Sequence, residues 1–147
     1  MRPGAVRRRV ERGCVGPRVR TAGPTELEWD DVRRYATLRF VESGVGGRDE
    51  AEMLSAQLAD WVGQPELRPY RLLVDCSEMV DVDASWRAIW GEHFRAHREI
   101  ATLAWFNANP RIQLIVLMFL KGTGAKGRPF EHEADARAYL DAEDPAA

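Results

Sequence analysis

Apolar residues recur along the chain with two different periods, which predict alternating strands and helices. Short apolar runs, such as the one at 70–76, are typical of strands buried in a sheet. Apolar positions three and four residues apart, as at Ala51, Leu54 and Leu58, are typical of helices that cover a sheet. The predicted strands are 27–32, 35–41, 70–76, 100–106 and 129–132, and the predicted helices are 49–62, 83–98, 110–121 and 133–142.

The order of these elements is ββαβαβαβα, which predicts an α/β fold. Strands that alternate with helices favour a mixed, mostly parallel sheet of about five strands with helices packed on it. The first two strands are close enough in sequence to form an antiparallel hairpin. The glycine-rich stretch 43–47 is interpreted as a flexible connection, and Gly63 ends the first helix.

Residues 1–24 differ from the rest of the chain. They hold three prolines, four glycines and seven arginines but almost no large apolar side chain. Such a segment buries too little surface to offset its ordering entropy, so we expect a disordered tail at 1–24 and one domain at 25–147.

Charge and cysteine content restrict the partners and the cellular location that the sequence allows. Seven arginines and one glutamate give the first 20 residues a net charge of +6, and the remainder carries –8. An acidic folded part argues against nucleic acid as its partner. Two scattered cysteines, no secretory signal and no apolar run long enough to cross a bilayer predict a cytoplasmic protein without a transmembrane segment.

The stretch 72–86, LLVDCSEMVDVDASW, resembles the central signature of STAS domains, the fold of anti-sigma-factor antagonists. In that signature a buried strand ends in Asp-x-Ser, matched by Asp75 and Ser77, and a second motif, Asp-Ser-Ser-Gly, opens a helix, matched from Asp83. The helix rich in tryptophan and the Phe-x5-Ala-x2-Tyr-Leu ending at 130–140 resemble the SpoIIAA-like family, which relates STAS domains to CRAL-TRIO-type lipid-binding folds.

The resemblance implies a candidate phosphorylation site and a docking surface. Ser85 matches the serine that is phosphorylated in these antagonists, while Ala84 and Trp86 depart from the motif. A phosphate at the start of a helix is favoured by free backbone N–H groups and by the helix dipole. We therefore expect a protein partner to bind around Asp83, Ser85 and Trp86.

The remaining sequence patterns do not predict a metal site, a cofactor site or a catalytic centre. His93 and His97 share one helical face but have no third ligand in sequence, so we expect no metal site. The G-x-G-x-x-G spacing at 122–127 lies too near the end of the chain to open a βαβ unit, and so we expect no nucleotide or other cofactor. Without a recognisable nucleophile and base, we expect no catalytic residues.

The helix around 112–120 is apolar almost all round. A helix lying on a sheet needs only one apolar stripe, so the other side is either covered or forms an exposed patch. A homodimer interface, a partner groove and the wall of an apolar pocket remain open. The residues predicted for this patch or pocket are Trp90, Ile112, Ile115, Val116 and Phe119.

The sequence thus supports two hypotheses for function. The first is a non-enzymatic regulatory module that binds a protein partner and is controlled at Ser85. The alternative is a binder or carrier of an apolar, lipid-like small molecule, which would use the helix 112–120 and the nearby tryptophans.

Overall fold

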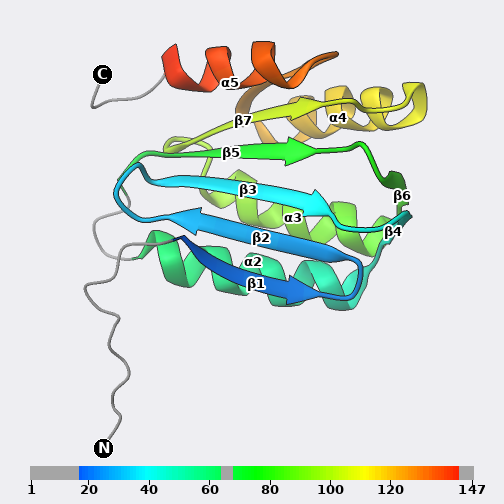
Figure 1. The fold of residues 1–147 in the computed structure, drawn as a ribbon, viewed down its shortest axis with the longest axis horizontal. Helices are drawn as coiled ribbons and strands as arrows, with labels where there is room; N and C mark the ends of the chain where they lie inside the picture. The colour runs from blue at the N-terminus through cyan, green and yellow to red at the C-terminus, as the bar shows by residue number, and fades with distance from the viewer. Residues whose placement is uncertain (1–16, 64–67, 143–147) are drawn as a thin grey trace, which may run out of the picture.

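A computed structural model describes residues 17–63 and 68–142. Its main feature is a six-stranded sheet with the order β1-β2-β3-β5-β7-β8 (Figure 1). These strands are β1 Arg18–Ala22, β2 Thr25–Asp30, β3 Tyr35–Phe40, β5 Tyr70–Asp75, β7 Ala101–Phe106 and β8 Lys126–Phe130. The first three pair antiparallel, and β3, β5, β7 and β8 pair parallel.

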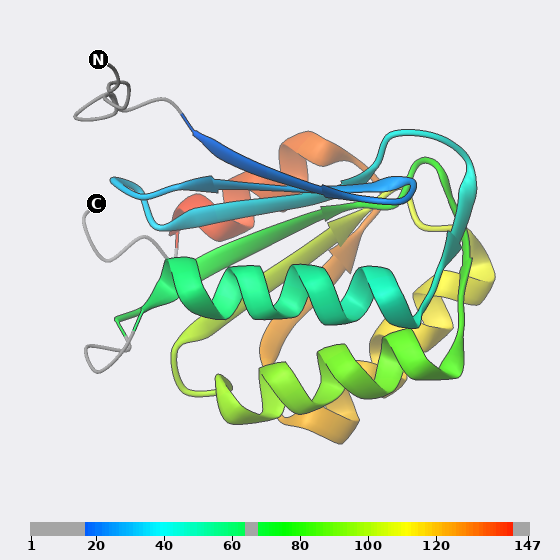
Figure 2. The same ribbon diagram turned by 90° about the horizontal axis from the view of Figure 1, so that it is seen from below.

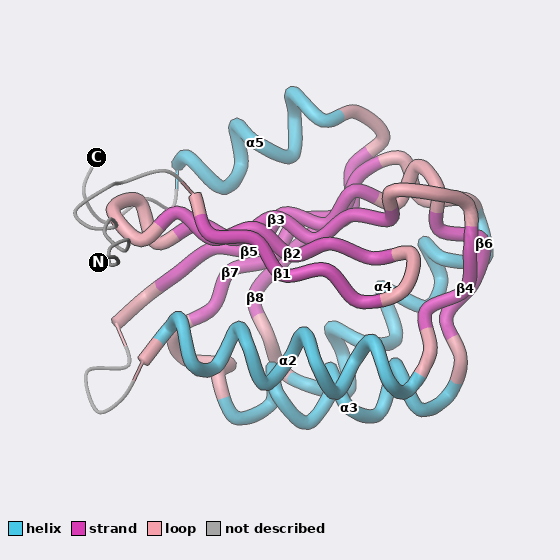
Figure 3. Tube along the Cα trace, turned by 60° about the horizontal axis from the view of Figure 1, so that its bottom comes forward, coloured by secondary structure: helices cyan, strands magenta, loops and turns pink. Residues whose placement is uncertain are grey.

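The four helices of the described residues cover the two faces of the sheet unequally. They are α2 Arg48–Val62, α3 Ala84–Ala96, α4 Pro110–Thr123 and α5 Glu133–Ala142. The first three lie against one face and α5 lies against the other (Figures 2 and 3). Alternation along the strands explains this division, because Leu72 and Val74 join the large core under α2, α3 and α4, while Leu73 between them joins the smaller core under α5.

A short second sheet connects the strands to the helices. Strand β4, Gly44–Gly46, pairs parallel with β6, Met79–Val82, and the two strands lead into α2 and α3. The glycine-rich connection expected at 43–47 is therefore partly a strand. Glycine has no side chain and so adds nothing to a hydrophobic pattern in the sequence. The pairing of this strand depends on backbone hydrogen bonds.

The predicted α/β order is confirmed, with every predicted helix and strand present, but the main sheet has one strand more than expected. The extra strand, β1, lies within the region that we expected to be disordered; residues 1–16 are outside the described residues. The prediction of disorder is wrong for residues 18–22 because backbone pairing with β2 orders them although most of their side chains are exposed.

Candidate functional site

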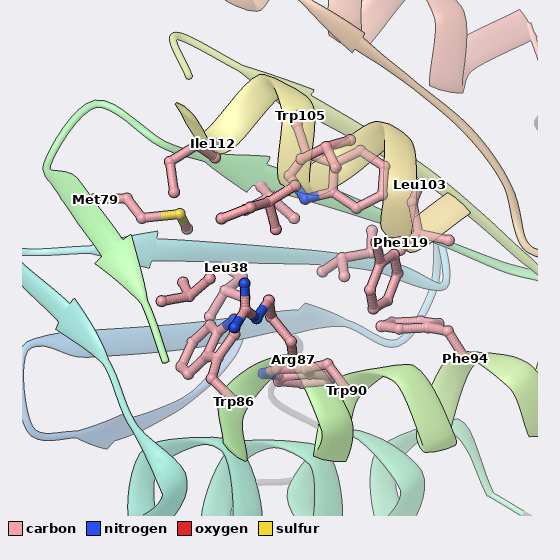
Figure 4. A pocket seen from close by; sticks show the side chains of 15 residues that line it. Leu38, Met79, Trp86, Arg87, Trp90, Phe94, Leu103, Trp105, Ile112 and Phe119 are labelled. Atoms are coloured by element: carbon pink, nitrogen blue, oxygen red, sulfur yellow. The ribbon is translucent and has the colours of Figure 1, made fainter. Parts of the chain in front are cut away.

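A pocket lies between the main sheet, α3 and α4 (Figure 4). It measures about 60 Å³. Its walls are apolar apart from one charged side chain, Arg87, and three indole N–H groups. The lining residues are Leu38, Leu72, Val74, Met79, Val82, Trp86, Arg87, Trp90, Phe94, Leu103, Trp105, Ile112, Ile115, Val116 and Phe119.

The regular spacing of these residues along their elements explains how they meet. Alternate strand residues such as Leu103 and Trp105 point to the same face of the sheet. The side chains of α3 at 86, 90 and 94 recur every four residues, and those of α4 at 112, 115, 116 and 119 follow the same helical face. All five residues that the sequence predicted for an apolar patch or pocket line this pocket.

Aromatic rings connect α3 to α4 across the pocket. Trp90 stacks on Phe94 with ring centroids 5.6 Å apart, and Phe94 meets the edge of Phe119 at 6.2 Å. Trp105 of β7 also meets Phe119, at 6.0 Å. Each such pair adds about 0.5–1.5 kcal/mol of stability beyond the contribution of the area it buries, so these contacts stabilise the pocket wall.

The pocket holds one buried polar atom without a partner. Trp90 is 4% exposed, and its indole Nε1–H has no hydrogen-bond acceptor among the described residues. Among the described residues, the only other buried side-chain oxygen or nitrogen without a hydrogen-bond partner is the Tyr35 hydroxyl. It lies under α5 on the opposite face of the sheet. An unsatisfied buried donor costs about 1–3 kcal/mol, so the Trp90 N–H needs an explanation.

Asp83 and Ser85, two of the predicted docking residues, lie at the start of α3, as the sequence predicted. Asp83 is exposed and caps α3, because its carboxylate accepts a hydrogen bond of 2.8 Å from the backbone N–H of Trp86. Ser85 is half-buried in the first turn of α3, and its phosphorylation stays a prediction.

Trp86 corrects the predicted docking surface. The side chain is only 6% exposed and forms part of the pocket wall. It packs against the backbone of Gly46, where a Cβ would lie 2.7 Å from the indole ring. The third residue of a capped helix faces the sheet here, and the absence of a side chain at Gly46 makes room for the indole. Most of this ring is therefore inaccessible to a protein partner at the surface.

The Asp-x-Ser motif has a structural role at the end of β5. The Asp75 carboxylate accepts hydrogen bonds from the backbone N–H of Ser77 at 2.9 Å and from its hydroxyl at 2.6 Å. The Ser77 hydroxyl in turn accepts one from the side-chain amide of Asn107 at 3.0 Å. These bonds fix the turn after β5 against the turn after β7, and so support the strands that form the floor of the pocket.

His93 and His97 are held by a residue that sequence spacing did not indicate. The Tyr70 hydroxyl lies 3.1 Å from His93 Nε2 and 2.6 Å from His97 Nδ1. Burial, reinforced by the nearby His97, lowers the pKa of His93 to about 3, and burial also lowers the pKa of His97. Within the described part of the chain no three His, Cys, Asp or Glu side chains come together as a metal site would require.

Helix α4 carries three exposed large apolar side chains. Leu114, Leu117 and Met118 are 60%, 53% and 65% exposed. They face away from the pocket side, which is formed by Ile112, Val116 and their neighbours. No helix in the described ranges combines the length and apolar character needed to span a membrane.

Comparison with known proteins shows the fold. No protein family and no curated protein matches the sequence. The structure is similar to the crystal structure of an uncharacterized protein of the DUF3478 family with a SpoIIAA-like fold from Shewanella loihica PV-4. The TM-score is 0.60 at 12% identity, and the match covers 85% of this chain and 92% of that chain. The chain therefore has a SpoIIAA-like fold, as the stretch 72–86 predicted.

Proposed function

We propose that this protein is a non-enzymatic binding module, and that its ligand is a small, largely apolar molecule held between the sheet, α3 and α4. The observation that carries the proposal is a pocket with aromatic walls that contains a buried, unpartnered indole N–H. Pockets of this composition, with a few polar groups among apolar ones, are typical of small-molecule sites. The SpoIIAA-like fold supports a binding module and leaves its ligand open.

The titratable groups of the described residues support a role without catalysis. Burial raises the pKa of the Cys76 thiol to about 12, which keeps the sulfur protonated and a poor nucleophile. His93 and His97 share hydrogen bonds with the Tyr70 hydroxyl, whose own pKa is raised by burial. Neither imidazole is paired with a serine or cysteine nucleophile in these contacts.

Filling the pocket from α4 should weaken the binding of an apolar ligand. We expect Ile115→Trp to place an indole in the pocket and to weaken the binding of 1-hexanol, an uncharged probe, by about tenfold or more in isothermal titration calorimetry. Leu117→Trp is the matched control, because Leu117 lies on the exposed side of the same helix and its replacement should leave binding unchanged.

The proposed function fails if 1-hexanol does not bind the wild type, or if Ile115→Trp binds it as tightly as the wild type does. Circular dichroism and thermal unfolding of both variants show whether the fold is kept. A folded Ile115→Trp variant makes the comparison valid, and Ile115→Phe provides a smaller filling residue if the indole destabilises the domain.

A protein-interaction role is the second candidate, favoured by the exposed apolar side of α4. Leu114, Leu117 and Met118 form an apolar patch that is exposed to water unless a partner covers it. A phosphate on Ser85 would change the charge at the start of the neighbouring helix α3. Light scattering of the wild type and of Leu117→Asp tests a second copy of the chain as the partner, since a dimer through this face would be lost in the variant.

A further inference from the structure

Among the pocket donors that have no acceptor in the described residues, two lie three positions apart on α3. One is the Trp90 Nε1–H, buried and unpartnered. The other is the guanidinium of Arg87, which makes no hydrogen bond or salt bridge with any described residue. A nearby carboxylate, Asp81, is already engaged, because it accepts a hydrogen bond of 3.0 Å from Arg111 Nε.

The two donors come from one stretch of α3. Arg87 and Trp90 are three residues apart, so their side chains are neighbours on the same helical face. Long helical side chains point back toward the N-terminus, which brings the indole of Trp90 toward the turn that carries Arg87. Figure 4 shows the indole nitrogen on the side of the Trp90 ring nearer to Arg87 and Trp86.

The carboxylate of Asp81 interacts with the charge of Arg87, but no hydrogen bond or salt bridge joins the two. The hydrogen bond from Arg111 is the main cause that lowers the pKa of Asp81, and the charge of Arg87 contributes without a direct contact. Arg87 is half-buried, and no described residue forms a hydrogen bond or salt bridge with its guanidinium. An anion bound in the pocket would accept hydrogen bonds from both donors at once.

We propose that the ligand is a small amphiphile whose carboxylate head accepts hydrogen bonds from Arg87 and from Trp90 Nε1, and whose short apolar tail fills the aromatic pocket. This assignment rests on the proposed function and specifies its ligand. The guanidinium and the indole together offer several N–H donors but a single positive charge. A carboxylate, with two acceptor oxygens and one negative charge, matches both properties.

The charge and the volume of the site narrow the ligand class. A phosphate monoester carries about –1.5 to –2 at neutral pH, more than Arg87 alone can balance, whereas a carboxylate carries –1. A cavity of about 60 Å³ suits a short tail rather than a whole lipid chain. Hexanoate is therefore a suitable probe, and 1-hexanol is its uncharged counterpart with the same tail.

The experiment compares the two probes by isothermal titration calorimetry on four proteins. We expect the wild type to bind hexanoate about tenfold or more tightly than 1-hexanol, because charge-assisted bonds exceed neutral ones in strength. Arg87→Met keeps the apolar stem and should bring hexanoate down to the affinity of 1-hexanol. Arg95→Met, on the exposed side of α3, removes the same charge and should change neither affinity.

Trp90→Phe provides the fourth protein and a readout that a purely structural role would not give. It removes the N–H but keeps an aromatic ring, so hexanoate affinity should fall severalfold while 1-hexanol affinity changes less. Hexyl phosphate should bind less tightly than hexanoate to the wild type.

The outcomes separate this inference from the proposed function. If 1-hexanol binds and hexanoate binds no more tightly, the carboxylate assignment is wrong and the apolar pocket stands. The assignment also fails if Arg87→Met and Arg95→Met weaken hexanoate equally, because the effect would then come from net charge. If neither probe binds, both the assignment and the proposed function are wrong.

Discussion

Replacing Phe94 by alanine is expected to lower the free energy of unfolding by about 3–5 kcal/mol. Phe94 is 2% exposed, stacks on Trp90 at 5.6 Å and meets the edge of His93 at 4.6 Å. Its removal takes a large buried ring out of the core and leaves a cavity continuous with the pocket. Urea denaturation of the two proteins measures the difference.

The enlarged cavity should also change what the protein binds. A dry apolar cavity of sufficient size takes up benzene, so benzene in the buffer should recover part of the stability that Phe94→Ala loses and should have little effect on the wild type. Phe94→Leu is the control, with an expected loss smaller than that of Phe94→Ala, because it leaves less empty volume. Equal losses for the alanine and leucine variants would contradict the packing described for Phe94.

Lowering the pH from 7 to 5 is expected to reduce the free energy of unfolding by about 1–2 kcal/mol through His93. Burial lowers the pKa of His93 from 6.5 to about 3 in the folded protein, so the folded state keeps this imidazole neutral. Between these two values the unfolded chain binds a proton that the folded chain does not. Stability is therefore complete above about pH 6.5 and is lost as the pH falls toward 3.

The matched variant is His93→Gln, which keeps a polar side chain near the Tyr70 hydroxyl but does not titrate. Its stability should depend less steeply on pH between 7 and 5 than that of the wild type, as measured by urea denaturation across this range. Carboxylates contribute to both proteins alike, so the difference between the two slopes isolates His93. Parallel slopes would show that burial does not hold His93 neutral in the folded protein.

The fold could be predicted because its core strands and helices carry strong periodic signals. The run at 70–76 and the helical spacing of Leu54 and Leu58 specify their elements locally. Strand β1 could not be predicted, because Arg18 to Thr21 are exposed and the strand depends on pairing with β2. Pairing between segments distant in sequence, as between β4 and β6, leaves no periodic signal either.

The candidate site was predictable only in part. The apolar face of α4 indicated Ile112, Ile115, Val116 and Phe119, because the residues that meet α3 repeat with helical spacing. Arg87 carried no such signal, since one arginine on a helix is ordinarily solvent-exposed. The burial of Trp86 depends on Gly46, forty residues earlier, and the packing of the two segments becomes evident only in three dimensions.

The most direct test of the central claim is the NMR spectrum of the indole N–H groups during titration with hexanoate. The chain has five tryptophans, three of which line the pocket, and single Trp→Phe variants assign the five signals. We predict that the signals of Trp86, Trp90 and Trp105 shift, with Trp90 moving most, while those of Trp29 and Trp61 stay in place. Signals of the three pocket tryptophans that do not move at saturating hexanoate, or that move no more than those of Trp29 and Trp61, would contradict the account.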